Sequence, residues 1–438
     1  MSQTIPLHTG AWYGDHEIAV ELPDSWQVAM SAPGTGRPLT DDEIRQRLRT
    51  PVGQPPIREA FRGCSRPLII LDDLNRPTPA SLVVPTLLEE LEEAGVSAGQ
   101  VRILMGPGTH GAPAADALPK KVGQAAASAC RLIVHDSRTD GVRIGRTSFG
   151  TPVLVNREVL ESDAVIGVGG LYPNHTAGFG GGAKLAIGVL GFRSIANLHF
   201  RHKSAGWGSF DVGNAFRRDL DEIARMIGLE TTISLLVDSQ RRVVDCICAD
   251  THTYYADALE SWKETFRTPG PGSSDVVIAN AYPNDLSLTF VRMKGTAPFA
   301  HARAGASRVV IAACPEGLGF HGLFPFMNVP RGHRARILAM RLPIILQRPG
   351  ETSVKMGRRL LRQVRRRPPR SAPLPVTSPS IWLYRTAADR SDPLPEWVPD
   401  MRISSSWEEI VEGVMREQGG RASLKASLYA CAPLQWIG

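Results

Sequence analysis

Short runs of apolar, β-branched residues recur along the chain, and each ends in Gly, Pro, Asp or Asn before a stretch with helical patterning. Such runs are typical of strands buried on both faces of a parallel sheet. They form two series: 67–71, 101–105, 131–134 and 164–168, and then 276–279, 308–313, 380–384 and 427–430. The pattern predicts the α/β class, with two largely parallel sheets flanked by helices.

A hairpin and a linker lie between the two series. The β-prone runs 232–237 and 242–247 flank the turn formers Asp238-Ser239-Gln240, so we expect a hairpin there. The segment 268–274, Thr-Pro-Gly-Pro-Gly-Ser-Ser, has the composition of a linker. We therefore predict an N-terminal catalytic and cofactor domain at 1–268 and a C-terminal α/β domain at 269–438.

Composition narrows the class of protein. Of the 438 residues, 42% are hydrophobic and 21% are charged, which predicts a folded chain rather than a disordered one. The net charge of +7 is local, because residues 331–370 hold thirteen Arg or Lys and one acid, Glu351. Six scattered Cys, an N-terminus without an apolar segment and the lack of a membrane-length apolar run predict a cytoplasmic location.

Polar residues gather directly after the predicted strands of the first series. Ligands of parallel α/β sheets bind outside the carboxyl ends of the strands, so these positions are candidates for a site. Asp72-Asp73-Leu-Asn-Arg76-Pro follows one strand and Gly108-Thr-His110 follows the next. Pro-Asn-His175 follows a third, leading to the glycine-rich segment 178–184 and to Asn-Leu-His199.

Each of these residues permits a structural and a chemical interpretation. Arg76 could bind a substrate carboxylate through two parallel hydrogen bonds, and Asp73 could orient Arg76 or bind a ribose hydroxyl. Alternatively, the cluster could be a capped turn with a surface ion pair. His110 and His175 could each be structural. Two imidazoles on opposite faces of a carbon centre are, however, what proton transfer from both sides requires.

The glycine-rich segment resembles a phosphate-binding loop but lacks a Walker A pattern. Gly178, Gly180, Gly181 and Gly182 would let backbone amides face an anion, yet Ala183 precedes Lys184 and no Ser or Thr follows it. Lys184 could bind phosphate, act as a nucleophilic amine or simply be solvated.

Two histidines three residues apart permit, without requiring, a metal site on a helix. His199 is the better candidate ligand. We expect His202 to be exposed because Arg201 and Lys203 flank it. Cys246 and Cys248 share one face of a hairpin strand, and we expect them to be core residues.

Taken together, the order and spacing of these motifs resemble the lactate racemase family that depends on a nickel-pincer nucleotide. The match covers about 130 residues, with weaker similarity at Tyr282-Pro-Asn-Asp and at Ala432-Pro-Leu-Gln. The resemblance implies a two-domain α/β isomerase with its site in the cleft between domains. It implies a racemase or epimerase that moves the α-hydride of a 2-hydroxy acid reversibly onto a pyridinium-derived mononucleotide carrying nickel.

The resemblance also implies roles for particular residues. Lys184 would form the covalent link to the cofactor, His199 would be the protein ligand of nickel, and the glycines would approach the cofactor phosphate. His110 and His175 would be the acid/base pair, and Arg76 would face the substrate carboxylate. Cofactor-synthesis proteins would be needed as partners for maturation.

The sequence departs from the family where the substrate is expected. Family members that act on lactate usually carry Gln and Lys three apart after Tyr-Pro, whereas this chain has Phe290 and Met293, with Lys294 one place off. We place Phe290 and Lys294 near the substrate and expect a 2-hydroxy acid bulkier or more apolar than lactate. Asn75 replaces the usual Thr, a change that we expect to be tolerated.

Two other functions remain as alternatives. A nucleotide-dependent phosphotransferase could use Gly178–Lys184, but it would have no use for three histidines. A nucleic-acid or partner-binding protein could act through the basic arm at 331–370, although this segment has no aromatic residue for base stacking, which makes nucleic acid the weaker choice.

Overall fold

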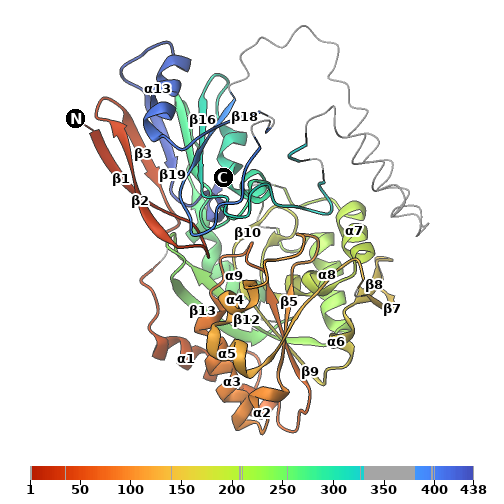
Figure 1. Ribbon diagram of the computed structural model, residues 1–438. Helices are drawn as coiled ribbons and strands as arrows, with labels where there is room; N and C mark the ends of the chain where they lie inside the picture. Colours follow the sequence, from red (N-terminus) through yellow and green to blue (C-terminus); the bar gives the residue numbers. More distant parts are fainter. Residues whose placement is uncertain are drawn as a thin grey trace. The chain divides into compact units, whose positions relative to one another are not determined.

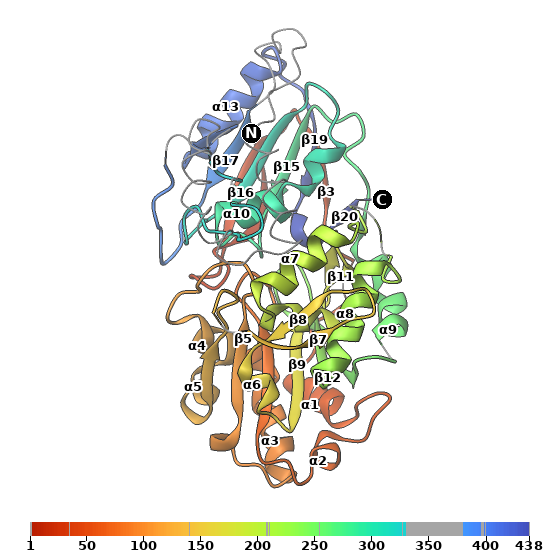
Figure 2. The same cartoon turned by 90° about the vertical axis from the view of Figure 1, so that its right-hand side faces the viewer.

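The computed structural model describes residues 2–34, 36–139, 141–206, 209, 211–253, 255–325, 327–329, 380–395, 398 and 400–437. The basic arm at 331–370 therefore lies outside the described residues. The chain divides into two compact units, one formed by Pro33–Arg267 and the other by Met1–Ala32 together with Thr268–Gly438. Both are α/β, as predicted (Figures 1 and 2).

The unit of residues 33–267 is built on a six-stranded sheet in the order β13-β12-β9-β4-β5-β6. All neighbouring strands run parallel except the β12–β13 pair, which is the antiparallel hairpin that the sequence predicts. The central strands are buried along their whole length, which explains their continuous apolar character. The six strands are β4 (Pro67–Asp72), β5 (Arg102–Gly106), β6 (Arg131–Val134), β9 (Ala164–Gly170), β12 (Leu229–Val237) and β13 (Val243–Asp250).

Two small antiparallel sheets, β7 (Val142–Arg146) with β8 (Pro152–Val155) and β10 (Pro173–Asn174) with β11 (Gly178–Phe179), complete the strands of this unit. Its α-helices are α1 (Asp41–Arg49), α2 (Ile57–Ala60), α3 (Val84–Glu93), α4 (Ala117–Val122), α5 (Gln124–Ala129), α6 (Arg157–Leu160), α7 (Phe192–Arg201), α8 (Ala215–Met226) and α9 (Tyr255–Trp262). Its 3₁₀ helices are η1 (Ala80–Leu82), η2 (Ala98–Gln100), η3 (Gly182–Val189) and η4 (Lys263–Phe266).

The second unit contains a six-stranded sheet in the order β18-β17-β16-β15-β19-β3, in which every neighbouring pair is parallel. Its strands are β3 (Gln27–Ser31), β15 (Val276–Asn280), β16 (Ser307–Ala312), β17 (Ile381–Arg385), β18 (Met401–Ser404) and β19 (Lys425–Tyr429). A hairpin of β1 (Ser2–Thr9) and β2 (His16–Pro23) precedes β3. The other elements are β14 (Arg267–Thr268), β20 (Trp436–Ile437), α10 (Leu288–Phe290), α13 (Trp407–Glu417), the π-helix η5 (Val291–Gly295), η6 (Ala297–His301) and η8 (Ala432–Leu434).

Alternation along β15 shows that this second sheet is buried on both faces. Val276 and Ile278 pack into a core with the β1–β2 hairpin and with α13. Val277 and Ala279 point into a separate core with Leu288, from α10, and its neighbours on the opposite face. Because successive side chains of a strand point to opposite faces, a strand covered on both sides needs an unbroken apolar run.

The described units differ from the predicted domains at the N-terminus. The boundary at Thr268 coincides with the predicted linker, but residues 1–32 group with the second unit instead of with residues 33–267. The physical cause is that β3 adds to the sheet edge beside β19, with Gln27 opposite Lys425 and Ser31 opposite Tyr429. Nothing in the local pattern of residues 1–32 signals a partner strand almost 400 residues away.

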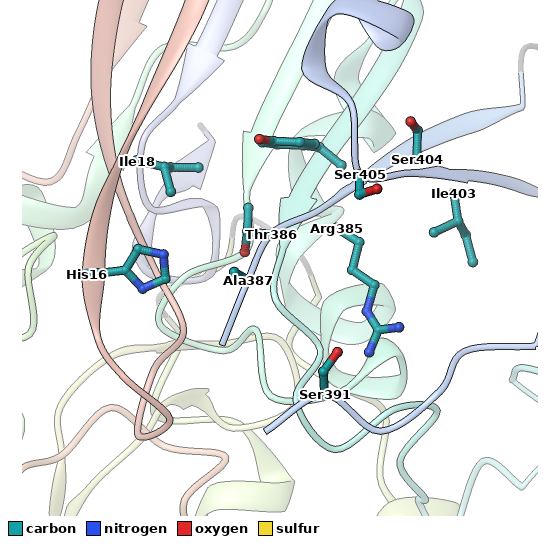
Figure 3. Close-up of a pocket in the computed structure, with 10 residues that line it drawn as sticks. His16, Ile18, Arg385, Thr386, Ala387, Ser391, Ile403, Ser404 and Ser405 are labelled. Atoms are coloured by element: carbon teal, nitrogen blue, oxygen red, sulfur yellow. The ribbon is translucent and has the colours of Figure 1, made fainter. Parts of the chain in front are cut away.

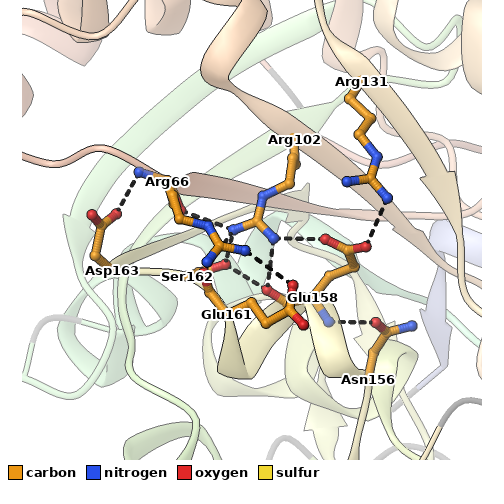
Figure 4. A network of polar contacts seen from close by, with 8 residues as sticks. All are labelled: Arg66, Arg102, Arg131, Asn156, Glu158, Glu161, Ser162 and Asp163. Atoms are coloured by element: carbon orange, nitrogen blue, oxygen red, sulfur yellow. Dashed lines mark hydrogen bonds and ion pairs between the residues drawn. The ribbon is translucent and has the colours of Figure 1, made fainter.

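A charged network fixes the amino ends of the first sheet (Figure 4). Arg102 begins β5 and is only 6% exposed. Its guanidinium donates to the Glu158 carboxylate at 2.6 Å, to the Ser162 hydroxyl at 2.7 Å and to the Arg66 carbonyl at 3.0 Å. This network lies at the sheet end opposite the polar loops described below, so we assign it to folding rather than to chemistry. Among the described residues, no helix is long and apolar enough to cross a membrane.

Candidate active site

The carboxyl ends of three adjacent strands, β9, β4 and β5, carry most of the polar residues singled out in the sequence. Asp73 and Arg76 follow β4, His110 follows β5, and Tyr172 and His175 follow β9. Because these strands are parallel neighbours, their loops leave the sheet at the same edge. The sheet topology therefore accounts for the grouping of these residues.

His110 is held between Asp73 and Arg76. Its Nδ1 lies 2.9 Å from Oδ2 of Asp73, and its Nε2 lies 3.4 Å from Nη2 of Arg76. A carboxylate only accepts and a guanidinium only donates, so both contacts assign the same tautomer, with the proton on Nδ1 and the lone pair on Nε2. The side chain of His110 is 15% exposed, and that of Asp73 is 4% exposed.

The electrostatics of this group favour a neutral imidazole beside an ionised carboxylate. Burial lowers the pKa of His110, the Asp73 carboxylate opposes this shift, and with the charges of Arg76 and Lys184 the net effect is a lowered pKa. Burial opposes ionisation of Asp73, but His110, Arg76 and the Asn75 amide together hold its pKa well below the ordinary value. His110 is thus available as a base at Nε2, and the lysine amine lies within electrostatic range of it.

Arg76 is positioned by its surroundings as well as by His110. Its Nη1 donates to the Asn75 carbonyl at 2.8 Å, and its guanidinium carbon lies 5.8 Å from the centre of the Tyr172 ring. Burial raises the pKa of the Tyr172 hydroxyl, so this group is neutral. The sequence did not suggest Tyr172, and no residue pattern around it distinguishes a ring that supports an arginine from an ordinary core tyrosine.

A fully buried lysine lies beneath the same turn. Lys121, in α4, has no exposed side-chain surface, and its Nζ lies 2.6 Å from Oδ1 of Asp72. The ammonium also donates to the carbonyls of Asp73 at 3.1 Å and of Arg76 at 3.2 Å. Burial lowers the pKa of Lys121, and the Asp72 carboxylate opposes this shift. The lysine therefore clamps both ends of the segment that presents Asp73 and Arg76.

The Asp72 carboxylate extends this clamp to the neighbouring strand. Its Oδ2 accepts from the Thr78 hydroxyl at 2.9 Å and from the Gly170 amide, at the end of β9, at 3.1 Å. Sequence reasoning missed Lys121, although it lies on the same face of its helix as the buried Ala117 and Leu118. A lysine on an apolar helical face was the signal that could have identified it.

His175 lies at the tip of the β10–β11 hairpin, in which Pro173 pairs with Phe179 and Asn174 with Gly178. Oδ1 of Asn174 accepts from the backbone amides of Thr176 and Ala177, at 3.1 and 3.0 Å, which shapes the turn that carries the imidazole. The side chain is partly buried. The role of His175 as the second acid/base residue stays a prediction.

The glycine-rich segment 178–184 begins with β11, and side chains from other elements bind its backbone carbonyl groups. The Gly180 carbonyl accepts from the Tyr255 hydroxyl, and the Gly181 carbonyl accepts from Nη2 of the fully buried Arg217 at 3.2 Å. Gly182 has φ +52°, and a Cβ there would lie 2.6 Å from Cδ2 of Tyr255. Sequence reasoning found the glycines but missed Arg217 and Tyr255, which are distant along the chain.

Lys184 lies in η3, a 3₁₀ helix that packs across β4, β5, β9 and β12. The glycines of β9 permit this close approach, since a Cβ at Gly169 would come within 2.5 Å of Leu185 in η3. A phosphate loop of the Walker type leads into an α-helix, whose aligned amides and dipole favour the anion. The short 3₁₀ helix here provides no such terminus, which argues against the phosphotransferase alternative.

His199, in α7, has a fixed orientation. Its Nδ1 donates to the Ile195 carbonyl at 2.8 Å, one helical turn earlier, so Nε2 is the nitrogen with the lone pair. The Phe216 ring packs edge-on against it at 5.0 Å between centroids. An imidazole that donates one nitrogen to a backbone carbonyl and presents the other is a common arrangement for a metal ligand. No cluster of three or more acidic, His or Cys side chains suited to a metal occurs in the described part of the chain.

The expectation for His202 was wrong. Its side chain is only 6% exposed, and Nε2 lies 2.6 Å from Oδ2 of the fully buried Asp219. Flanking charges misled the prediction because His202 directly follows the last residue of α7, and its side chain turns inward toward the rings of Phe149 and Phe216. Cys246 and Cys248 are buried, as expected.

Phe290 and Lys294 belong to the other unit and are almost fully buried in it, with 2% and 6% exposure. Phe290 lies 6.3 Å from the ring of His321. Their proposed contact with substrate stays a prediction.

Comparison with known proteins adds to this geometry. Residues 13–208 match the lactate racemase N-terminal domain. The lactate racemase of Thermoanaerobacterium thermosaccharolyticum is 26% identical over 334 residues, which cover 71% of this chain and 76% of that protein. The lactate racemase of Lactiplantibacillus plantarum is 25% identical over 296 residues, covering 65% of this chain and 69% of that protein.

Solved structures show the same fold. The lactate racemase apoprotein from T. thermosaccharolyticum aligns with a TM-score of 0.68 at 18% identity, over 99% of this chain and 100% of that one. A protein from Thermotoga maritima aligns with a TM-score of 0.58 at 15% identity, over 92% of this chain and 99% of that one.

Proposed function

Because the chain belongs to the lactate racemase family, we propose that it interconverts the two configurations at C2 of a 2-hydroxy acid. The observation that carries the proposal is the contact between Nε2 of His110 and the guanidinium of Arg76. In a 2-hydroxy acid the hydroxyl and the carboxylate are attached to neighbouring carbons. A base and a guanidinium that already touch each other are spaced to bind these two groups at once.

In this proposal His110 takes the hydroxyl proton at Nε2, while Asp73 holds the ring in the required tautomer and stabilises the imidazolium that forms. Arg76 binds the carboxylate and thereby holds the substrate hydroxyl next to the imidazole of His110. His110 removes the hydroxyl proton from one configuration of the substrate, and His175 removes it from the other. Inversion requires such a base on each face of the planar 2-oxo acid.

The residues fit a nickel-pincer nucleotide as the cofactor. Nε2 of His199 carries the lone pair that a nickel ion requires, and imidazole is a suitable donor for Ni²⁺. Lys184 would hold the nucleotide covalently, and the backbone of Gly178–Gly182 would bind its phosphate. When bound, this group would accept the α-hydride and return it. Loading it requires the cofactor-synthesis proteins of the host.

We propose a substrate larger or more apolar than lactate, since the family resemblance implies polar residues where this chain carries Phe290 and Met293. A panel of lactate, 2-hydroxybutyrate, 2-hydroxyisovalerate and 3-phenyllactate, each assayed for kcat/KM, tests this choice. The larger acids should exceed lactate. A panel in which lactate is the best substrate would overturn this choice of substrate and leave the reaction class intact.

The reaction class is tested by following the hydrogen at C2. A single enantiomer of the substrate labelled with deuterium at C2 is incubated in ordinary water with the loaded enzyme. Hydride transfer predicts that the opposite enantiomer forms with its deuterium retained, and that His110→Gln abolishes this conversion. The matched control is His301→Gln, because His301 is exposed and lies in the other unit. Conversion with loss of the label to solvent, or no conversion by loaded protein, contradicts the proposal.

A further inference from the structure

A second pocket lies within the unit formed by residues 1–32 and 268–438, at the carboxyl ends of β17 and β18 (Figure 3). Its volume is about 630 Å³, which falls in the range that small-molecule sites occupy. The polar residues that line it are His16, Arg385, Thr386, Ser391, Ser404 and Ser405. All belong to one unit, whereas Lys184 and His110 belong to the other.

Arg385 is the only permanent charge among the lining residues, and it is fixed in place by neutral groups. Its Nε donates to the Ala313 carbonyl at 3.4 Å, and its Nη2 donates to the carbonyls of Cys314, at 3.3 Å, and Asp392. Its Nη1 donates to no described residue. The three acceptors carry no formal charge, so the positive charge of the guanidinium is not cancelled by a direct partner.

The carboxylate of Asp392, whose backbone carbonyl Arg385 contacts, is already paired with another arginine. Both oxygens of Asp392 are engaged by Arg390, at 3.0 and 2.6 Å. No Asp or Glu lines the pocket. Arg385 therefore presents its Nη1 end and an uncancelled charge to whatever occupies the pocket.

Hydroxyl groups and an apolar wall surround this charge. Ser391 and Ser405 are exposed, and their hydroxyls bond to no described residue, so both can turn toward a ligand. Ile403 forms the apolar wall on the face of the sheet that Arg385 also faces, whereas Ile18 and the ring of Tyr384 line the pocket from the opposite face. A single charged end, two hydroxyls and an aliphatic wall match a ligand with one anionic group and a short apolar body.

We propose that this pocket binds a small monocarboxylate, with its oxygens on Nη1 of Arg385 and on the serine hydroxyls and its carbon chain against Ile403. A phosphate group fits less well, because a dianion would need a second cation and the lining supplies no lysine or second arginine. The position agrees with the rule that ligands of parallel sheets bind at the carboxyl ends of the strands.

The test uses the full chain purified from a host that does not make the cofactor, so its outcome is independent of the racemase reaction. Isothermal titration calorimetry with butyrate, butyramide and inorganic phosphate separates the possible ligand classes. Butyrate should bind, and butyramide, which lacks the charge, should bind at least about tenfold more weakly, equivalent to about 1.4 kcal/mol. Equal binding of the amide, tighter binding of phosphate or no binding of butyrate would overturn the proposal.

Variants locate the binding to this pocket. Arg385→Met should weaken butyrate at least about tenfold, while Arg416→Met, at an exposed arginine of α13 that does not line the pocket, should leave it unchanged. Because Arg385 also donates to three backbone carbonyls, its replacement could disturb folding. A second variant therefore leaves Arg385 in place. Ala387 is exposed and lines the pocket, so Ala387→Glu should abolish butyrate binding by repulsion and the matched Ala387→Gln should not. Unchanged binding in Ala387→Glu would refute the site.

Discussion

Replacement of Lys121 by Met removes the ammonium beneath the site and keeps the length of the side chain. The substitution leaves the Asp72 carboxylate without its cation, although the Thr78 hydroxyl and the Gly170 amide still donate to it. It also deprives the carbonyls of Asp73 and Arg76 of a donor. The turn that presents both residues then loses its support from α4.

The magnitude follows from burial. Lys121 has no exposed side-chain surface and Asp72 has 10%, so the pair is a buried ion pair. Removing one partner of such a pair costs about 3–5 kcal/mol of unfolding free energy, because the remaining charge stays buried. The neighbouring Lys120 provides a matched control: it is 29% exposed and pairs with an Asp116 that is 59% exposed. An exposed pair of this kind contributes about 0–1 kcal/mol.

Native-state hydrogen exchange measures the effect locally. Amides of β4 should lose protection equivalent to about 3–5 kcal/mol in Lys121→Met. They should change by less than about 1 kcal/mol in Lys120→Met. Amides of β15, in the other unit, serve as an internal reference. In loaded enzyme the same variant should raise the KM for the 2-hydroxy acid, since Arg76 is no longer held.

Two results would refute this reasoning. One is a loss of protection in Lys121→Met no larger than in Lys120→Met, which would mean that the ion pair does not support the turn. The other is additivity in the double variant Asp72→Asn/Lys121→Met, since residues in direct contact should show a coupling energy.

Three further substitutions test the site. Asp73→Asn should lower kcat/KM by about 10²–10⁴-fold, because the tautomer of His110 is no longer held. Without the carboxylate the pKa of His110 should fall further, so the acid limb of the pH profile should move to lower pH. An unmoved acid limb would contradict the pairing of Asp73 with His110. His199→Gln should reduce bound nickel, measured by metal analysis, and retain the covalent adduct on Lys184; loss of both would assign His199 a different role. Gly182→Ala should reduce the adduct fraction measured by intact mass, because its Cβ collides with the Tyr255 ring, and an unchanged fraction would place the nucleotide elsewhere.

Sequence patterns located the sheets because buried parallel strands carry unbroken apolar runs. All eight strands predicted in the two series correspond to strands of the structure, from β4 at 67–72 to β19 at 425–429, and the two strands of the predicted hairpin are β12 and β13. The patterns missed β1, β2, β3 and β18, as well as the short strands β7, β8, β10, β11, β14 and β20. The β1–β2 hairpin alternates exposed and buried positions, and β18 has only four residues, so neither produces a long apolar run.

The candidate site was predictable where chemistry and position coincide. Arg76 and His110 each follow a parallel strand of one sheet, Lys184 follows the β10–β11 hairpin that comes after β9, and all three carry a group with obvious reactivity. The supporting residues were not predictable, because their roles depend on burial. Lys and Arg usually lie at the surface, and only the fold shows that Lys121 and Arg217 are buried among carbonyl groups. His202 was misjudged for the same reason.

The central claim is that Lys184 carries a nickel-containing nucleotide next to His110. Intact-mass and metal analysis of protein from a host that makes the cofactor tests it most directly. Wild type, and the control Lys203→Ala at an exposed lysine, should gain a nucleotide-sized mass and nickel. Lys184→Ala should gain no covalent mass. An adduct that persists in Lys184→Ala, or wild-type protein without adduct and nickel, would contradict the claim.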